Sequence, residues 1–203
     1  MAAKDKEIIG KIDLIKNTSL SIGGGQQLVA VNADWRNKFS NLATLCSKWR
    51  QENPTFTNSE FVITDERTAK WLDINIANAN DTVLFIINSE QYGAIGHIGF
   101  DIAADNGIWI SRVCRGEKYL PGIMGRALKT ICNLLFAKFN VAAIFLDCYA
   151  DNLHAIKFYK DNNFMISSKK EFCQKYIDGE LKWVECTKED KPSRTMLIFR
   201  LLH

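Results

Sequence analysis

The chain has 203 residues, of which 47% are hydrophobic and 24% charged, and 26 basic against 23 acidic side chains give a net charge of +3. This length corresponds to one domain, and the composition excludes a disordered chain, a collagen-like chain and a coiled coil. No apolar run approaches the length of a membrane span, the charged N-terminus does not resemble a secretion signal, and the small, mixed charge does not indicate a nucleic-acid partner.

The first half of the chain predicts an extension, two helices and a strand meander. The triple glycine at 23–25 separates a predicted N-terminal extension over residues 1–25 from a domain over residues 26–203. Apolar residues at three- and four-residue steps predict a helix over 34–52. A second helix begins near Thr64, where a hydroxyl cap precedes acidic residues. The period then changes to two, which predicts strands over 82–87, 93–103 and 108–115, with an Asn-Gly turn before the last one.

The second half returns to helical periodicity. Residues 124–139 form an amphipathic helix, and the near-continuous apolar run over 141–148 predicts a buried central strand. Asp151 or Asn152 caps a further helix that ends near residue 160. Asp178-Gly179 predicts a hairpin, and 195–202 the last strand. The order of elements indicates a mixed α/β layer structure around a central sheet.

The six cysteines are not expected to bind metal. None stands in a Cys-x-x-Cys pair and the chain has only three histidines, so a zinc site is not predicted. Cys132 and Cys148 lie in apolar runs, which is typical of reduced thiols in the core of a cytoplasmic protein.

The most informative loop joins the strand over 108–115 to the helix over 124–139. A glycine-containing loop that runs into a helix N-terminus presents unpaired N–H groups and the positive end of the helix dipole, which suits a phosphate or pyrophosphate. Arg115, Lys118 and Arg126 add positive charge. Neither a P-loop pattern nor a dinucleotide-binding pattern is present. Such joints also occur without any ligand, so the loop alone leaves both interpretations open.

A second stretch, 146–164, favours the interpretation that the loop binds a ligand. Its pattern, Asn152-x-x-Ala155-Ile156-x-Phe158-Tyr159, resembles the GNAT superfamily of acyl-CoA N-acetyltransferases. The resemblance covers about residues 30–202 and implies an α/β fold with a central mixed, mostly antiparallel sheet, a splayed strand pair and helices on both faces. It implies acetyl-CoA as co-substrate and no metal. The loop sequence departs from the family's usual pattern at Tyr119 and Met124.

The resemblance also assigns site residues. The strand and loop that hold the cofactor correspond to Val113, Cys114, Arg115, Gly116, Pro121, Gly122, Ile123, Met124, Gly125 and Arg126, joined by Asn152. Tyr159 is expected to give a proton or hydrogen bond to the departing thiolate. His97, on a strand face shared with Asp101, is expected to act as a base or a substrate contact. Attack by the amine is expected to be direct, because Cys114 has no evident histidine partner for an acyl-enzyme.

The acceptor is a small primary amine in this interpretation. Trp49-Arg50 and the stretches around Thr64, His97 and Val113 resemble members that acetylate nucleotide-linked amino sugars for cell-surface glycans, and Trp49 and Arg50 are predicted to bind the substrate. Peptide-amine acetyltransferases share parts of this pattern and are the alternative, beside a catalytically silent acyl-CoA-binding module. Each residue also has a purely structural interpretation as core aromatic, helix cap or loop charge. The oligomeric state stays open, a homodimer included.

Overall fold

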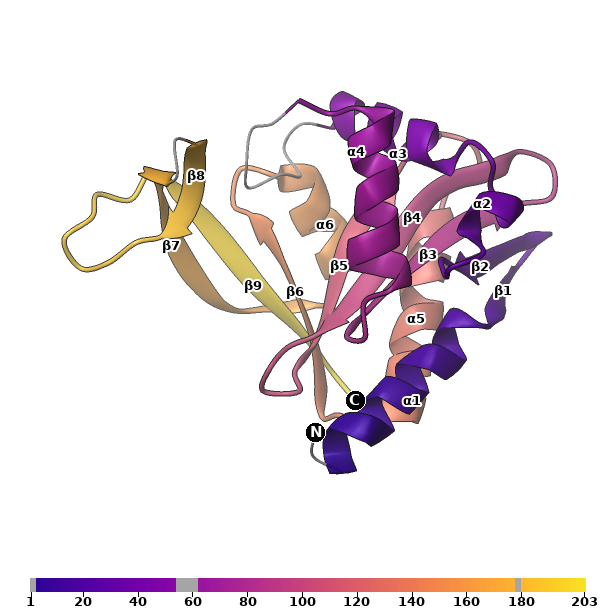
Figure 1. Cartoon of the computed structure of the whole chain (residues 1–203). Coiled ribbons are helices and arrows are strands. Elements are labelled where there is room, and N and C mark those ends of the chain that lie inside the picture. The colour runs from indigo at the N-terminus through magenta and orange to yellow at the C-terminus, as the bar shows by residue number, and fades with distance from the viewer. Residues whose placement is uncertain (1–2, 54–61, 178–179) are drawn as a thin grey trace.

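A computed structural model describes residues 3–53, 62–177 and 180–203 (Figure 1). Its helices are α1 (Ala3–Lys16), α2 (Trp35–Lys38), α3 (Leu42–Glu52), α4 (Asp65–Trp71, continued by a π-helical segment over Leu72–Ala77), α5 (Ile123–Phe139) and α6 (Leu153–Asp161). Its strands are β1 (Ser19–Gly23), β2 (Gln26–Ala30), β3 (Thr82–Ser89), β4 (Gly93–Ile102), β5 (Ile108–Arg115), β6 (Ala143–Tyr149), β7 (Met165–Ile177), β8 (Glu180–Glu185) and β9 (Arg194–Leu202).

Within the described residues, nine strands form one sheet in the order β1-β2-β3-β4-β5-β6-β9-β7-β8. Every paired neighbour is antiparallel except β5 and β6, which run parallel and share only the register pairs Ile108↔Ile144 and Trp109↔Phe145. Beyond these pairs the two strands diverge, so that β6 to β9 turn away from the rest of the sheet (Figure 1). The predicted mixed, mostly antiparallel sheet with a splayed strand pair is confirmed.

Two hydrophobic clusters cover the two faces of the sheet. One packs α1, α5 and α6 against the sheet and buries residues such as Ile12, Leu128 and Tyr159. The other packs α3 and the π-helical segment on the opposite face and buries Trp49 and Leu72. Helices therefore flank both faces, as predicted. No helix of the described chain is long and apolar enough to cross a membrane.

The segment before residue 26 packs on this same framework. Ile12 and Ile15 of α1 lie in the core, and β1 pairs with β2, which pairs with β3. The triple glycine forms the tight hairpin between β1 and β2, where all three glycines have positive φ, a conformation that glycine adopts without strain. The triple glycine is therefore a hairpin turn, and the division into an extension over 1–25 and a domain over 26–203 stays a prediction.

The helix predicted over 34–52 is wrong in one respect, because it breaks into α2 and α3 around Phe39 to Asn41. The apolar spacing is kept across the break, and Trp35 and Trp49 are both buried. Ser40 and Asn41 have polar side chains that favour non-helical turns. The spacing of the apolar residues, from which the helix was predicted, does not reveal such a break.

The caps and turns of the remaining elements agree with those predicted from the sequence. The Thr64 hydroxyl accepts a hydrogen bond from the Arg67 amide (3.2 Å) and caps α4 as predicted. Asn106 has a φ of 65°, which confirms the Asn-Gly turn before β5. The predicted hairpin at Asp178-Gly179 lies outside the described residues, between the antiparallel strands β7 and β8.

Candidate active site

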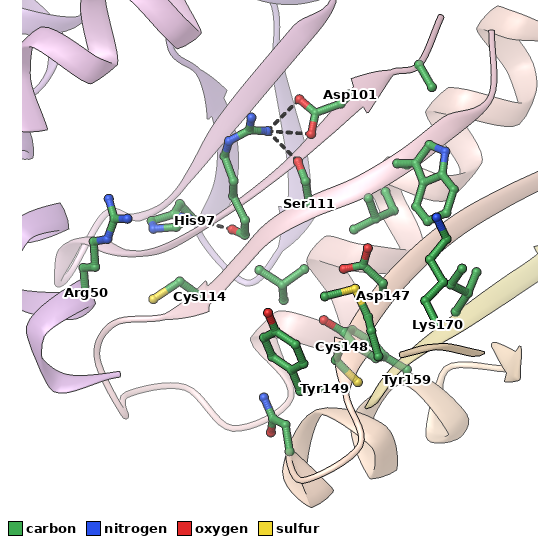
Figure 2. A pocket seen from close by; sticks show the side chains of 18 of the residues that line it. Arg50, His97, Asp101, Ser111, Cys114, Asp147, Cys148, Tyr149, Tyr159 and Lys170 are labelled. Carbon is green, nitrogen blue, oxygen red and sulfur yellow. Dashed lines mark hydrogen bonds and ion pairs between the residues drawn. The ribbon is translucent and has the colours of Figure 1, made fainter. Parts of the chain in front are cut away.

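A cavity of about 770 Å³ opens where β5 and β6 diverge (Figure 2). Its walls come from α3 and α4, from β4, β5 and β6, from α6 and from β7 and β9. The parallel ladder ends at Trp109, so the edge of β5 from Ile110 onward faces this cavity instead of a neighbouring strand. Its backbone N–H and C=O groups are therefore available to a ligand that lies between the two strands.

A bulge in β5 shapes the centre of the cavity. The β4–β5 register changes between the pairs His97↔Cys114 and Gly99↔Ser111, and Arg112 in between has a φ of 53°. This left-handed conformation is held by the side chain, because the Arg112 guanidinium donates to both carboxylate oxygens of Asp101 (2.7 and 2.9 Å). A bulge re-aims the residues that follow it, here Val113 and Cys114, both of which line the cavity.

His97 lies in the cavity wall with its protonation state fixed by its surroundings. The Nδ1 atom is 2.7 Å from the Arg112 carbonyl oxygen, which can only accept, so Nδ1 carries the proton and Nε2 has the lone pair. Desolvation lowers the pKa of His97 to about 4. Asp101, which shares a strand face with His97, does not hold the imidazole directly: Asp101 accepts from the Arg112 guanidinium, and the Arg112 carbonyl accepts from the imidazole.

The second strand of the pair leads to Asn152 and Tyr159. Asn152 accepts a hydrogen bond from the Ala155 amide (3.1 Å) and caps α6 as predicted, and it also lines the cavity. The Tyr159 side chain is 6% exposed, packs against Phe199 (5.6 Å between ring centroids) and lines the same cavity. Burial, with smaller effects of Cys148 and Asp147, raises the pKa of Tyr159, so the phenol keeps its proton.

The loop before α5 presents bare backbone amides. Gly122 precedes the helix with a φ of 78°, and no side chain caps this end. The Ile123 amide donates to Leu120 O and the Arg126 amide to Gly122 O, which leaves the N–H groups of Met124 and Gly125 unpaired within the described chain. The Met124 side chain packs in the core, so the departure from the family pattern at this position does not obstruct the helix end.

The arginine side chains near this loop form hydrogen bonds within the protein. The Arg115 guanidinium donates to the Lys118 carbonyl (2.9 Å), and the Arg126 guanidinium donates to Gln26 Oε1 on β2 (2.8 Å). Arg115 therefore stiffens the loop, and Arg126 ties α5 to the sheet.

The two predicted substrate residues separate in the structure. Arg50 lines the cavity, and burial, followed by the nearby Arg67 charge, lowers its pKa. Trp49 is fully buried, donates from Nε1 to Glu117 (3.1 Å) and does not line the cavity. Trp49 does not reach the cavity, because the apolar stripe of α3 turns it inward, and its role in binding the acceptor stays a prediction. Gly116 makes room for it, since a Cβ there would lie 2.0 Å from the Trp49 ring.

Cys114 lies beside the bulge as a neutral thiol. It is 4% exposed, and burial raises its pKa to about 12, which disfavours the thiolate that an acyl-enzyme would need. All six cysteines are free, and no group of three or more His, Cys, Asp or Glu residues in the described part of the chain is placed to hold a metal ion.

Sequence reasoning missed Asp147, which lines the cavity from β6. Burial raises the pKa of its carboxyl, and Lys170 opposes that effect. The available signal was a single carboxylate at the end of an apolar strand, on the face opposite Ile144 and Leu146 of the core.

Comparison with known proteins gives one family. The family model described as "Acetyltransferase (GNAT) family" matches residues 45–164, more than half of the chain. No curated protein sequence matched.

Solved structures show the same fold at low sequence identity. An acetyltransferase from Salmonella typhimurium that modifies the N-terminal serine of ribosomal protein L7/L12 is 14% identical, with a TM-score of 0.69 over 92% of this chain and 99% of that one. RimL, a ribosomal L7/L12 alpha-N-protein acetyltransferase in complex with coenzyme A, is 14% identical with a TM-score of 0.67 over 91% and 98%. A probable GNAT acetyltransferase from Chromobacterium violaceum is 13% identical with a TM-score of 0.65 over 91% and 85%.

Proposed function

Because the chain belongs to the GNAT family and is an acetyl-CoA-dependent N-acetyltransferase, we propose that its cavity brings acetyl-CoA and a primary amine together for direct transfer. The observation that carries this proposal is the cavity at the divergence of β5 and β6, with Tyr159 and the edge of β5 in its walls. A thioester laid along that edge would share the cavity with the Tyr159 side chain.

The cofactor lies along β5 and ends at α5 in this proposal. The backbone of Val113 to Gly116 binds the pantetheine arm, because this edge has no strand partner, and Asn152 contacts the arm from the N-terminus of α6. The pyrophosphate lies against the loop Pro121-Gly122-Ile123 and accepts hydrogen bonds from the N–H groups of Met124 and Gly125 at the positive end of α5. Arg126 adds its charge nearby from its position against Gln26.

Acetyl transfer then needs a hydrogen-bond donor for the thioester carbonyl oxygen and a proton donor for the departing sulfur. A backbone N–H of the bulged strand at Val113 or Cys114 stabilises the carbonyl oxygen as it gains charge. The amine nitrogen forms the C–N bond, the C–S bond breaks, and Tyr159 gives its proton to the departing sulfur. The raised pKa of Tyr159 keeps the phenol protonated until that step. His97, whose pKa is about 4, is a weak base and contacts the acceptor as a neutral imidazole.

We propose a nucleotide-linked amino sugar as the acceptor, in cytoplasmic synthesis of cell-surface glycans. The acceptor side of the cavity combines aromatic walls, including Trp71 and Trp109, with the cations Arg50 and Lys170. Aromatic faces suit a base or a sugar ring, and cations suit a diphosphate. Six free cysteines are consistent with a reducing compartment.

The second candidate acceptor is a protein or peptide N-terminus. The named activities of the Salmonella enzyme and of RimL, whose folds this chain shares, favour it. A catalytically silent acyl-CoA-binding module is the third outcome that an experiment has to distinguish.

The rate of thiol release from acetyl-CoA distinguishes the three candidates, which are the amino-sugar acceptor, the peptide acceptor and the silent binding module. Purified protein is incubated with acetyl-CoA and either a UDP-linked amino sugar or a ten-residue peptide that begins with serine. The proposal predicts faster release with the amino sugar, and faster release with the peptide would instead establish the second candidate. Tyr159→Phe should lower turnover about 100-fold while it leaves acetyl-CoA binding intact. Tyr176→Phe, at an exposed position on β7, is the matched control. Release that neither acceptor accelerates would indicate the silent module.

A further inference from the structure

An aromatic pair lies at the point where β5 and β6 part. Trp109 and Phe145 form the last register pair between the two strands, and their rings stack with 5.4 Å between centroids and 29° between planes. Both side chains are half-buried, and neither belongs to a hydrophobic cluster of the described core. Trp109 also lines the cavity, so the stacked pair extends the cavity wall toward the start of β5.

A cation lies beside this pair on the same face of the sheet. The register pairs Phe145 with Arg200 of β9, and directly opposed residues of antiparallel strands have Cβ atoms about 5 Å apart on one face. The Arg200 side chain is exposed and forms no hydrogen bond or ion pair with another residue in the described parts of the chain. Its guanidinium is therefore available to an anionic ligand.

The helices of the described chain leave the face of these three side chains open. Ile144 and Leu146 alternate with Phe145 and pack in the cluster under α5, so Phe145 points to the opposite face. The cluster that α3 and the π-helical segment form on that face includes no residue of β6, β7 or β9. These strands turn away from α3 and α4 (Figure 1), and Met165, the register partner of Arg200, is 53% exposed. A ligand that leaves the cavity along the strands therefore meets this face.

The spacing along β5 fits a long acceptor. Trp109 lies four residues before Val113 at the bulge, which is about 13 Å along a strand. Ser111 lies between them on the cavity wall. In a nucleoside-diphosphate sugar, the sugar and the diphosphate separate an amine from the base by a comparable length. A peptide N-terminus offers neither a flat base nor a diphosphate to this face.

We propose that this face binds the nucleotide of the acceptor: the base stacks on Trp109 beside Phe145, and Arg200 binds the diphosphate. The inference rests on the proposed function and places this nucleotide away from α5, where the cofactor's pyrophosphate lies. Aromatic side chains accept any base, because every base has a π face, and a guanidinium binds phosphate through charge-assisted hydrogen bonds. The Trp109 indole N–H, which donates to no residue of the described chain, is available to an oxygen of the nucleotide.

Calorimetric titration of the CoA-loaded protein with UDP, and separately with uridine, measures this site directly. We expect Arg200→Gln to weaken UDP binding about 10-fold and to leave uridine binding unchanged, because uridine has no phosphate. Trp109→Leu should weaken the binding of both about 10-fold, because both stack through the base. Lys138→Gln, which removes an exposed cation in the last turn of α5, is the matched control and should bind UDP like the wild type.

Steady-state kinetics give a second readout that a structural role would not produce. For the UDP-linked amino sugar, Arg200→Gln should raise KM about 10-fold with kcat near the wild-type value, because the lost contact lies far from the reacting atoms. For free glucosamine, which has no nucleotide to reach this face, KM should not change. Equal losses with both acceptors would indicate a structural effect and overturn the inference.

The outcomes separate the inference from the proposed function. If the wild-type protein acetylates the UDP-linked amino sugar, but Arg200→Gln and Trp109→Leu bind UDP as tightly as it does, the inference alone is overturned. Absence of UDP binding also overturns it, while acetylation of free glucosamine by the same protein leaves an amino sugar as the acceptor. A wild-type protein that acetylates only the serine peptide contradicts the proposed acceptor, and the inference with it.

Discussion

Replacing Gly116 with alanine tests the packing that holds the cofactor loop to the sheet. A Cβ at this position would lie 2.0 Å from Trp49 Cε2 and 2.3 Å from Cδ2 and Nε1, well inside van der Waals contact. Trp49 is fully buried and donates to Glu117, so the ring cannot move without disturbing the core and that hydrogen bond. Overpacking costs about 1–3 kcal/mol, and a lost hydrogen bond to a carboxylate about 1.5–3 kcal/mol. The free energy of unfolding should therefore fall by about 2.5–6 kcal/mol, a large share of a typical domain's stability.

Urea unfolding followed by tryptophan fluorescence measures this loss. The matched control is Gly10→Ala in α1, where an added Cβ meets no atom within 4 Å. At that helical position alanine should stabilise the protein by about 0.5–1 kcal/mol. A Gly116→Ala protein as stable as the wild type would refute the packing of Trp49 against residue 116.

Three further predictions concern single side chains. The pKa of His97 falls from 6.5 in the unfolded chain to about 4 in the folded one. Wild-type stability should therefore drop as the pH falls from 6.5 toward 4, by about 1.4 kcal/mol per pH unit at most. The urea midpoint of His97→Gln should lack this pH dependence, and an unchanged dependence would contradict the assignment to His97. Thr64→Ala removes the cap of α4 and should cost about 1 kcal/mol in thermal or urea unfolding, and no change would contradict the capping role. Cys114 should react with a thiol reagent at neutral pH only on unfolding, because burial raises its pKa to about 12; rapid labelling of native protein would show otherwise.

The features that sequence reasoning predicted are encoded locally. Thr64 and Asn152 cap their helices because each side chain bonds an amide three residues later, which spacing alone reveals. Asn106 precedes a glycine in a turn that requires a positive φ. Tyr159 reaches the cavity because its position in the helix follows from the cap at Asn152.

The features that it missed depend on tertiary contacts. The inward turn of Trp49 depends on Gly116, which is distant in sequence, and the π-helical segment depends on packing that periodicity does not report. The bulge at Arg112 results from pairing with Asp101 across two strands. Asp147 becomes a cavity residue only because β6 leaves β5 after two register pairs, which no single strand pattern encodes.

The central claim is that acetyl-CoA binds between β5 and β6 with its pyrophosphate at the start of α5. Calorimetric titration with acetyl-CoA, beside acetyl-pantetheine without the phosphates, tests it most directly. The account predicts saturable binding of one acetyl-CoA per chain, and much weaker binding of the fragment that lacks the pyrophosphate. Equal affinity for both would contradict the site at Met124 and Gly125, and no binding of acetyl-CoA by folded protein would contradict the cofactor site altogether.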